Sequence, residues 1–226
     1  MSTKYATIVR AVFSLVTLAS TYGTPSLSCP CQDIPKPAAD DPSYSRQKGL
    51  DFTHTAAYRK EFSEAIRQAR QACLRHLGEK NVAIVSDIDE TLLDNRLEFE
   101  RHPKFTWELF DQWINESVAP TLKPTFEFLS WARAHGFAVF LITGRTEDQR
   151  RATINNLVKR NVSFDGLYMR PEGTHALSEE MKSTYRKQIE AMGFKIVVNI
   201  GDQVSDLYGG SAEDCEKLPN RIYYIP

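Results

Sequence analysis

The sequence predicts an α/β fold in which a parallel sheet lies between two layers of helices. Short apolar runs rich in β-branched residues, typical of strands buried on both faces, alternate with segments of helical periodicity. Such alternation implies parallel strands joined by helical crossovers. Three of the runs end in polar signatures, which parallel strands would bring to one edge of the sheet. We therefore expect a three-layer core with a functional site at that edge.

Length and composition fit a single globular domain with a tail. The chain has 226 residues, of which 42% are hydrophobic and 25% are charged, and this is enough to bury a substantial core. The formal net charge is -1, and no long basic run is present. We therefore expect no nucleic-acid partner.

The N-terminus has the pattern of a secretory signal peptide. Lys4 and Arg10 precede an apolar run over residues 11–19, and small and polar residues follow through residue 28. The apolar run is too short to span a membrane. We predict that residues 1–28 are a signal peptide and that the protein is exported, as a periplasmic, secreted or lipid-anchored form. A frayed N-terminal helix is the alternative interpretation.

The four cysteines fit an exported protein without defining a disulfide framework. Cys29 is a candidate for lipid attachment after cleavage, although Leu27 departs from the usual lipobox. Cys29 and Cys31 are otherwise tail thiols or a local disulfide. Cys73 lies on the apolar side of a predicted helix and is expected to be a core residue.

Residues 29–55 contain four prolines and no apolar period, and are predicted to be a linker or an arm on the domain surface. The domain itself is expected to span residues 56–226, with a small helical cap at about residues 95–123, directly after the first polar signature. The aromatic residues of that cap are core residues by default, although part of the segment could cover the site. Periodicity predicts helices over residues 56–77, within 105–114, over 124–136, 147–159 and 177–192, and strands over 82–85, 137–142, 165–169, 196–200 and 222–225.

Asp87 and Asp89 directly follow the first strand. Two nearby carboxylates raise each other's pKa unless a cation or hydrogen bonds offset their repulsion. Such a pair usually binds a divalent metal, or divides the work between a nucleophile and a proton donor. The plainer alternative is that both side chains cap the following helix.

Two further strand ends carry Thr143-Gly144-Arg145 and Gly201-Asp202 with Asp206, and Lys182 lies near a helix start. Taken singly, Thr143 and Asp206 could be helix caps, and Lys182 could be a surface lysine. In a doubly wound sheet, however, these strand ends lie side by side. Four carboxylates, a hydroxyl and a lysine then describe a magnesium-dependent phosphate site. The roles of Arg145, Arg186 and Lys217 stay open between bracing these carboxylates and forming surface ion pairs.

These motifs resemble those of the haloacid dehalogenase (HAD) superfamily of phosphohydrolases. They are Asp-Ile-Asp-Glu-Thr at residues 87–91, Leu-Ile-Thr-Gly-Arg at 141–145, Lys182, and Gly-Asp-x-x-x-Asp at 201–206. The stretches 182–186, 199–207 and 217–224 are similar to the branch that holds the plant vegetative storage proteins and the bacterial lipoprotein-type class B and class C acid phosphatases. The resemblance extends from about Ala56 to the C-terminus and implies a Rossmann-like core.

The resemblance also implies roles for single residues. Asp87 would be the nucleophile, and Asp89 the general acid and base. Thr143, Gly144 and Lys182 would bind the phosphoryl group. Asp87, Asp202, Asp206 and the backbone carbonyl of Asp89 would hold Mg²⁺.

The implied activity is magnesium-dependent acid phosphatase action on small phosphomonoesters through an aspartyl-phosphate. A nucleoside-monophosphate phosphatase is one alternative, with Phe105, Trp107 or Tyr208 stacking on the base. A storage or binding protein with vestigial activity on the same fold is the other.

Overall fold

The computed structural model describes residues 34, 36–38, 41–102 and 104–225. Within them a five-stranded parallel sheet has the order β3-β2-β1-β4-β5. The strands are β1 (Val82–Ser86), β2 (Ala138–Thr146), β3 (Gly166–Arg170), β4 (Lys195–Gly201) and β5 (Asp214–Lys217). The predicted α/β fold with a parallel sheet is thus confirmed.

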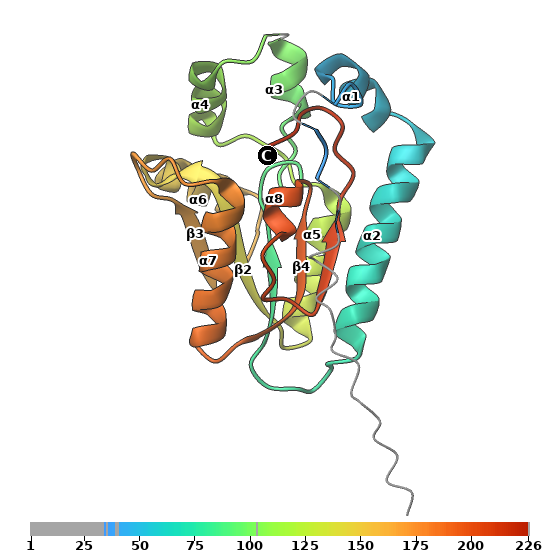
Figure 1. Cartoon of the computed structure of the whole chain (residues 1–226), viewed down its shortest axis with the longest axis vertical. Helices are drawn as coiled ribbons and strands as arrows, with labels where there is room; N and C mark the ends of the chain where they lie inside the picture. Colours follow the sequence, from blue (N-terminus) through green and yellow to red (C-terminus); the bar gives the residue numbers. More distant parts are fainter. Residues whose placement is uncertain (1–33, 35, 39–40, 103, 226) are drawn as a thin grey trace, which may run out of the picture.

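Helices cover both faces of this sheet (Figure 1). The larger ones are α2 (Ala56–Leu74), α5 (Lys123–Ala134), α6 (Arg150–Lys159) and α7 (Ser178–Ala191). The shorter ones are α1 (Arg46–Thr53), α3 (Arg96–Arg101), α4 (Trp107–Glu116), the 3-10 turn η2 (Glu147–Gln149) and α8 (Val204–Leu207). Helices α3 and α4, from the segment predicted to be a cap, lie above the carboxyl ends of the strands in Figure 1.

The apolar run of β1 is continuous because side chains on both of its faces are buried. Ile84 packs in a cluster with residues of α2 and α5, among them Ala69 and Phe128. Val85, which points to the other face, packs with Ile189 of α7. Burial of one such side chain stabilises the fold by about 1.5–3 kcal/mol.

Strand β1 is central, between β2 and β4. The chain crosses over from β1 to β2 on one side and from β3 back to β4 on the other, so the order of strands reverses beside β1. In open α/β sheets, ligands bind at the carboxyl ends of the strands next to such a reversal. The end of β1, where Asp87 follows Ser86, therefore has the position expected of a site.

Two predicted segments differ from the structure. Residues 46–53, expected to belong to a linker or an arm on the domain surface, form the helix α1, which buries Leu50 and Phe52. Residues 222–225, expected to be a strand, have no strand structure, because their backbone binds side chains: Ile222 N–H donates to Asn220 Oδ1 and Ile225 N–H to Gln203 Oε1. The edge strand is instead β5, a short charged segment with no apolar signal.

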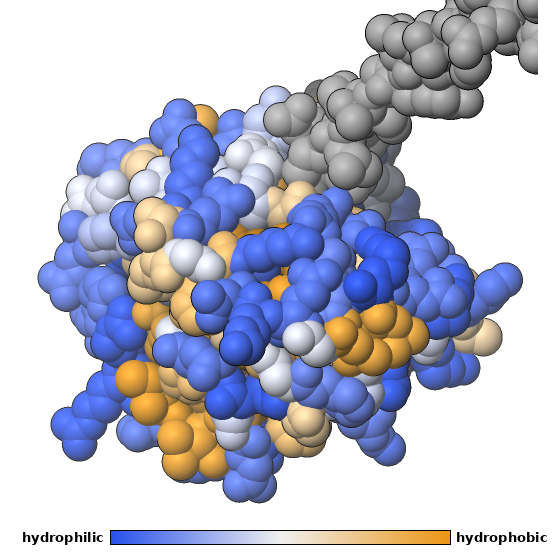
Figure 2. Space-filling view, turned by 90° about the horizontal axis from the view of Figure 1, so that it is seen from below, coloured by the Kyte–Doolittle hydropathy of each residue, from blue (hydrophilic) through white to orange (hydrophobic). Residues whose placement is uncertain are grey.

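The predicted signal peptide and Cys29 lie outside the described residues. No helix in residues 34, 36–38, 41–102 and 104–225 is long and apolar enough to cross a membrane. The face at the end opposite to α3 and α4 is largely hydrophilic, with hydrophobic residues in separate small areas (Figure 2). Two exposed apolar side chains near the end of α2, Leu74 and Leu77, are 49% and 46% exposed.

Candidate active site

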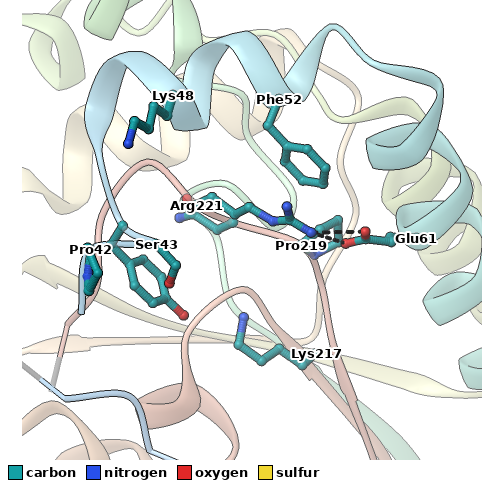
Figure 3. Close-up of a pocket in the computed structure, with 10 residues that line it drawn as sticks. Pro42, Ser43, Lys48, Phe52, Glu61, Lys217, Pro219 and Arg221 are labelled. Carbon is teal, nitrogen blue, oxygen red and sulfur yellow. Dashed lines mark hydrogen bonds and ion pairs between the residues drawn. The ribbon is translucent and has the colours of Figure 1, made fainter.

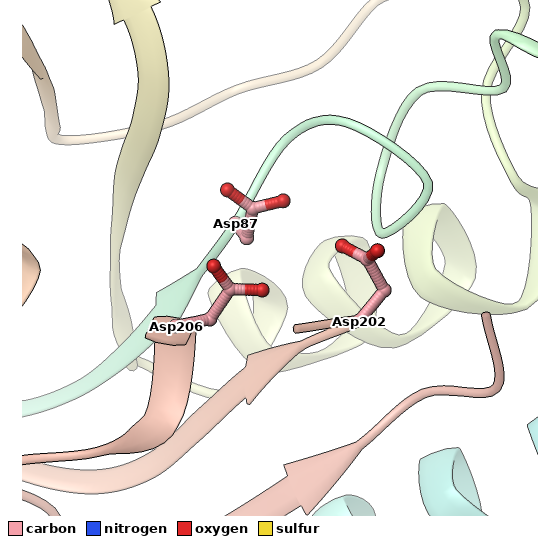
Figure 4. A group of neighbouring side chains, drawn as sticks. All are labelled: Asp87, Asp202 and Asp206. Carbon is pink, nitrogen blue, oxygen red and sulfur yellow. The ribbon is translucent and has the colours of Figure 1, made fainter. Parts of the chain in front are cut away.

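The three buried carboxylates Asp87, Asp202 and Asp206 face one another at the ends of β1 and β4 (Figure 4). Asp87 is held there by its N–H, which donates to Ile200 O of β4 at 3.0 Å. One oxygen from each carboxylate lies within 4.8 Å of the other two, which is a spacing that suits a metal ion. The convergence predicted from the strand ends is therefore present for these residues.

Lys182, in the second turn of α7, joins two of the carboxylates. Its Nζ donates to Asp87 Oδ1 at 2.6 Å and to Asp206 Oδ1 at 2.5 Å. Burial lowers the pKa of Lys182, but Asp206 and Asp87 outweigh it, so the pKa lies above its ordinary value. Lys182 therefore remains a buried cation directly beside Asp87.

The charges in this group do not balance. The ammonium of Lys182 pairs with Asp87 and Asp206, and Asp202 is the third carboxylate of the group. With all three carboxylates ionised, the group and Lys182 together carry two negative charges. Burial and then repulsion by Asp206 raise the pKa of Asp87 well above its ordinary value. The same two causes raise the pKa of Asp202 to about 6. A hard divalent cation bound by oxygen ligands would remove this imbalance, so the residues fit the predicted metal.

Asp202 and Asp206 are oriented by neighbours that the sequence did not single out. Gln203 Nε2 and Asn220 Nδ2 each donate to Asp202 Oδ2 at 2.6 Å, and Thr91 Oγ1 donates to Asp202 Oδ1 at 3.2 Å. The backbone N–H of Gln203 donates to Asp206 Oδ2 at 2.8 Å. Thr91 and Gln203 stand inside the recognised motifs, whereas Asn220 reaches the site only because the C-terminal segment folds over it.

Gly201 has a steric role beside Asp206. A Cβ at position 201 would lie 2.4 Å from Asp206 Cβ, closer than any side chain tolerates. The glycine of the Gly-Asp-x-x-x-Asp motif therefore lets Asp206 approach the end of β4.

Asp89 lies in a different environment from Asp87. Arg145 binds its carboxylate in a fork, with Nη2 donating to Oδ1 at 2.7 Å and Nε lying 3.1 Å from both oxygens. Asn95 Nδ2 also donates to Oδ1, at 2.9 Å. Burial raises the pKa of Asp89, but Arg145, Asn95 and Lys182 together more than offset this, and the pKa lies below its ordinary value. The Asp89 carboxylate is not in the metal-type group, which leaves its backbone carbonyl as the predicted ligand.

Thr143 and Gly144 stand at the end of β2, next to Asp89. Thr143 is fully buried, and its Oγ1 lies 3.4 Å from Asp89 Oδ2 and accepts from Arg145 N–H at 3.1 Å. Gly144 is exposed. Thr143 therefore contacts Asp89, the predicted proton donor, and the next residue, Gly144, is accessible to solvent.

The sequence left the roles of Arg145, Arg186 and Lys217 open, and in the structure all three bind groups of the site. Arg145 binds Asp89, as described. Lys217 Nζ donates to the backbone carbonyl of Asp202 at 2.9 Å. Arg186 donates to the carbonyls of Asp206 at 2.7 Å and Gly210 at 2.9 Å. The alternative that they form only surface pairs is wrong.

A cavity of about 580 Å³ is present in the structure, and none of the three aspartates of the site lines it (Figure 3). It opens between residues 42–52, α2 and the loop at residues 217–221, and neither Asp87 nor Asp89 lines it. Two of its lining residues also contact the site: Lys217 binds the backbone carbonyl of Asp202, and Asn220 donates to the Asp202 carboxylate. We therefore place the reaction at the carboxylates and not in this cavity.

The segment after the first motif carries exposed aromatic side chains. Trp107 is 71% exposed and Phe105 is 41% exposed, and their rings pack edge to face with centroids 4.9 Å apart. Phe105 also packs on Phe110, which stacks on buried Phe99. The inner rings are thus core residues, whereas the outer pair is accessible.

A family model described as HAD superfamily, subfamily IIIB (acid phosphatase) matches residues 42–226. Acid phosphatase 1 of Solanum lycopersicum is 36% identical over 149 residues, which cover 62% of this chain and 58% of that protein. The stem 28 kDa glycoprotein of Glycine max is 32% identical over 187 residues, covering 77% of this chain and 72% of that protein. This chain thus matches little more than half the length of the tomato protein.

Vegetative storage protein 2 of Arabidopsis thaliana is 26% identical over 148 residues, which cover 63% of this chain and 56% of that protein. Among solved structures, the class C acid phosphatase from Bacillus anthracis with tungstate bound is similar, with a TM-score of 0.62 and 23% identity over 79% of this chain and 85% of that chain. At this identity the likeness supports the fold. Together these matches confirm the resemblance that the motifs predicted.

Proposed function

We propose that this chain, which belongs to the subfamily IIIB acid phosphatases of the HAD superfamily, is an exported magnesium-dependent phosphatase of small phosphomonoesters. The observation that carries the proposal is the buried group of Asp87, Asp202 and Asp206 around Lys182. A buried carboxylate that contacts a lysine and has an unbalanced negative neighbourhood is suited to attack phosphorus when a divalent cation is bound.

In the proposed reaction, an oxygen of Asp87 attacks phosphorus while the bond from phosphorus to the ester oxygen breaks. Asp89 gives its proton to that ester oxygen, so the alcohol leaves neutral. Lys182 and Thr143 stabilise the charge of the transferred phosphoryl group, and Gly144 offers a backbone N–H on its open side. Asp89 then takes a proton from water, which attacks the aspartyl-phosphate and releases phosphate from Asp87.

Asp87, Asp202, Asp206 and the carbonyl of Asp89 would hold the Mg²⁺. The bound cation would supply charge neutralisation, so that the anionic nucleophile and the phosphate can approach each other. Lys182 alone leaves two negative charges in the group, and this is the structural reason to expect a cation requirement.

Two features support export. The N-terminal sequence has the pattern of a signal peptide, and Cys215 on β5 is disulfide-bonded. Disulfides persist mainly in oxidising compartments. Cys73, in contrast to Cys215, is a free cysteine buried in the core. Attachment of lipid at Cys29 remains a sequence-based prediction.

The nucleophile is tested by Asp87→Asn. Because the amide is a poor nucleophile, we expect hydrolysis of p-nitrophenyl phosphate to fall by about 10⁴-fold or more while the fold is kept. Circular dichroism and the unfolding midpoint are the controls for folding. Activity within about tenfold of the parent would contradict the mechanism, and full activity of the parent in excess EDTA would contradict the metal requirement.

A nucleoside-monophosphate phosphatase is the second candidate. The accessible Phe105 and Trp107 favour it, because an exposed aromatic face above the strand ends can stack on a base. Turnover compared across nucleotides and sugar phosphates tests this candidate. If Trp107→Ala protein prefers nucleotides over sugar phosphates to the same degree as the parent, stacking of a base on Trp107 is excluded.

A storage or binding protein with vestigial activity is the third candidate, and the similarity to proteins named vegetative storage proteins favours it. The complete set of Asp87, Asp89, Thr143, Lys182 and Asp202 weighs against it. Turnover near zero with Mg²⁺ on every ester tested, in protein that still binds phosphate, would support storage or binding over catalysis.

A further inference from the structure

We propose that Asn95 is a positioning residue for Asp89, and that Trp113 of the cap helix α4 sets the orientation in which Asn95 does so. The inference rests on the proposed function, because it concerns the step in which Asp89 gives a proton to the leaving group. The sequence did not single out Asn95 or Trp113 for the site.

The two oxygens of Asp89 have unequal partners. Oδ1 accepts from Asn95 Nδ2 at 2.9 Å and from Arg145 Nη2 at 2.7 Å. Oδ2 has only the shared Arg145 Nε at 3.1 Å and the long contact with Thr143 Oγ1 at 3.4 Å. Because a carboxylate oxygen has two lone pairs in its plane, two close donors occupy Oδ1. Oδ2 is thus the oxygen left to carry the proton.

The Asn95 amide is fixed by a donor that cannot reverse its role. The indole Nε1–H of Trp113 donates to Asn95 Oδ1 at 2.8 Å, and an indole has no acceptor. The carbonyl end of Asn95 must therefore face Trp113, and the NH₂ end must face Asp89. Asn95 is 0% and Trp113 is 2% exposed, so solvent water does not compete for either contact.

The contacts from Trp113 through Asn95 to Asp89 connect the predicted cap segment with the proposed proton donor. Trp113 belongs to α4, which lies over the sheet in Figure 1. Asn95 is the N-cap residue directly before α3, and its backbone N–H donates to Glu90 Oε1 at 3.0 Å. Because that bond uses the backbone, a change of the Asn95 side chain leaves it in place. The side-chain contact with Asp89 can therefore be tested separately.

The experiment compares kcat/KM of Asn95→Leu protein on phosphate esters of decreasing leaving-group acidity, from 2,4-dinitrophenyl through p-nitrophenyl to glycerol phosphate, with Mg²⁺ present. An ester whose alcohol is already acidic hardly needs a proton donor. We expect a loss of about 30-fold on glycerol phosphate and below about threefold on the dinitrophenyl ester, since a positioned acid contributes about 10²–10⁴-fold. A loss equal on all esters would overturn the proposal.

Two further variants separate positioning from damage to the fold. Trp113→Phe keeps an aromatic ring in the core but removes the N–H together with part of the indole. We expect the same dependence on the leaving group as for Asn95→Leu, with a smaller slope. Asn156→Leu is the matched control: this buried amide binds the backbone N–H and carbonyl of Ala119 at 3.0 and 2.8 Å, away from Asp89. It should reduce stability without changing the dependence on the leaving group. If Asn95→Leu does not fold, the Trp113→Phe series decides the question.

Asp89→Asn distinguishes failure of this inference from failure of the proposed function. If Asp89→Asn shows the steep dependence on leaving group and Asn95→Leu and Trp113→Phe do not, the positioning role is wrong and the function stands. If Asp89→Asn shows no such dependence, Asp89 is not the acid, and both the mechanism and this inference are overturned.

Discussion

Asp87 and Asp89 are two residues apart, are both buried, and have opposite surroundings. Asp87 shares the ammonium of Lys182 with Asp206 and also faces Asp202, and its pKa is raised by burial and repulsion. Asp89 has a guanidinium, an amide and a hydroxyl for itself, and its pKa is lowered, with the guanidinium, the amide and Lys182 together outweighing burial. One carboxylate is short of positive charge and the other is not.

This difference gives the two residues different chemistry. A group that lacks positive charge can take up a cation and a phosphate, which is what the proposed nucleophile requires. Arg145, Asn95 and Thr143 give the Asp89 carboxylate a fixed orientation, which is what the proposed proton donor and acceptor requires. Two identical side chains acquire distinct roles through their environments, as in other enzymes that use carboxylate pairs.

Among the predictions from this comparison, the largest effect is expected from removing the cation that contacts Asp87. In Lys182→Met protein, Asp87 and Asp206 lose their shared ion pair, and the transferred phosphoryl group loses the same positive charge. We expect kcat with saturating Mg²⁺ to fall by about 10³-fold, since loss of one stabilising donor costs about 10²–10³-fold. The measurement is steady-state hydrolysis of p-nitrophenyl phosphate.

Lys195→Met is the matched control for that variant. Lys195 is on β4 and pairs with Glu79 and Glu213, but its side chain is 43% exposed. Exposed pairs contribute little, so its kcat should stay within about twofold of the parent. A Lys182→Met enzyme that is equally active would show that the charge balance at Asp87 is irrelevant to catalysis.

The Asp89 region predicts an effect on stability. Arg145→Gln leaves a buried carboxylate without its cation, and we expect a loss of about 3 kcal/mol in urea unfolding at pH 7. Because Arg145 lowers the pKa of Asp89, this stabilisation is present above the ordinary pKa of 3.8 and is lost as pH falls through the folded value. The difference between parent and variant should therefore shrink at acid pH.

Arg133→Gln, which breaks a half-exposed ion pair with Asp165, is the control and should cost below about 1 kcal/mol. Equal losses for Arg133→Gln and Arg145→Gln would show that the Asp89 fork is no stronger than a surface pair.

The smallest effect concerns a carboxylate whose pKa is raised outside the site. Burial, with repulsion by Asp214 and Glu64, raises the pKa of Glu216 from 4.5 to about 7. Its proton favours the folded state at low pH, and this contribution is lost as pH rises through about 7. Glu216→Gln should therefore raise the melting temperature at pH 8 by roughly 2 °C and change it little at pH 4.5. A larger gain at pH 4.5 than at pH 8 would reverse the sign and exclude this explanation.

The sequence by itself determined the parallel sheet, and its motifs predicted that Asp87, Asp202 and Asp206 lie together at the strand ends, as they do in the structure. Strands β1, β2 and β4 are buried on both faces, so their apolar runs predict strands from the sequence. The edge strand β5 is short and charged and has no apolar signal, whereas residues 222–225 are apolar and predict a strand that the structure does not have. Their backbone partners are the side chains of Asn220 and Gln203, which no local pattern encodes.

Only the tertiary structure decided that the negative charge of Asp89 is balanced by a nearby cation and that the charge around Asp87 is not. Asp87 and Asp89 are the same residue type in one motif, and their difference comes from side chains distant in the sequence: Lys182 and Asp206 at one, Arg145 at the other. Asn95 is near in sequence, but its orientation depends on Trp113 of another helix. Electrostatic environment is set by neighbours in space, so a motif can identify the two aspartates, and its resemblance can imply their roles, without showing which side chains surround each of them.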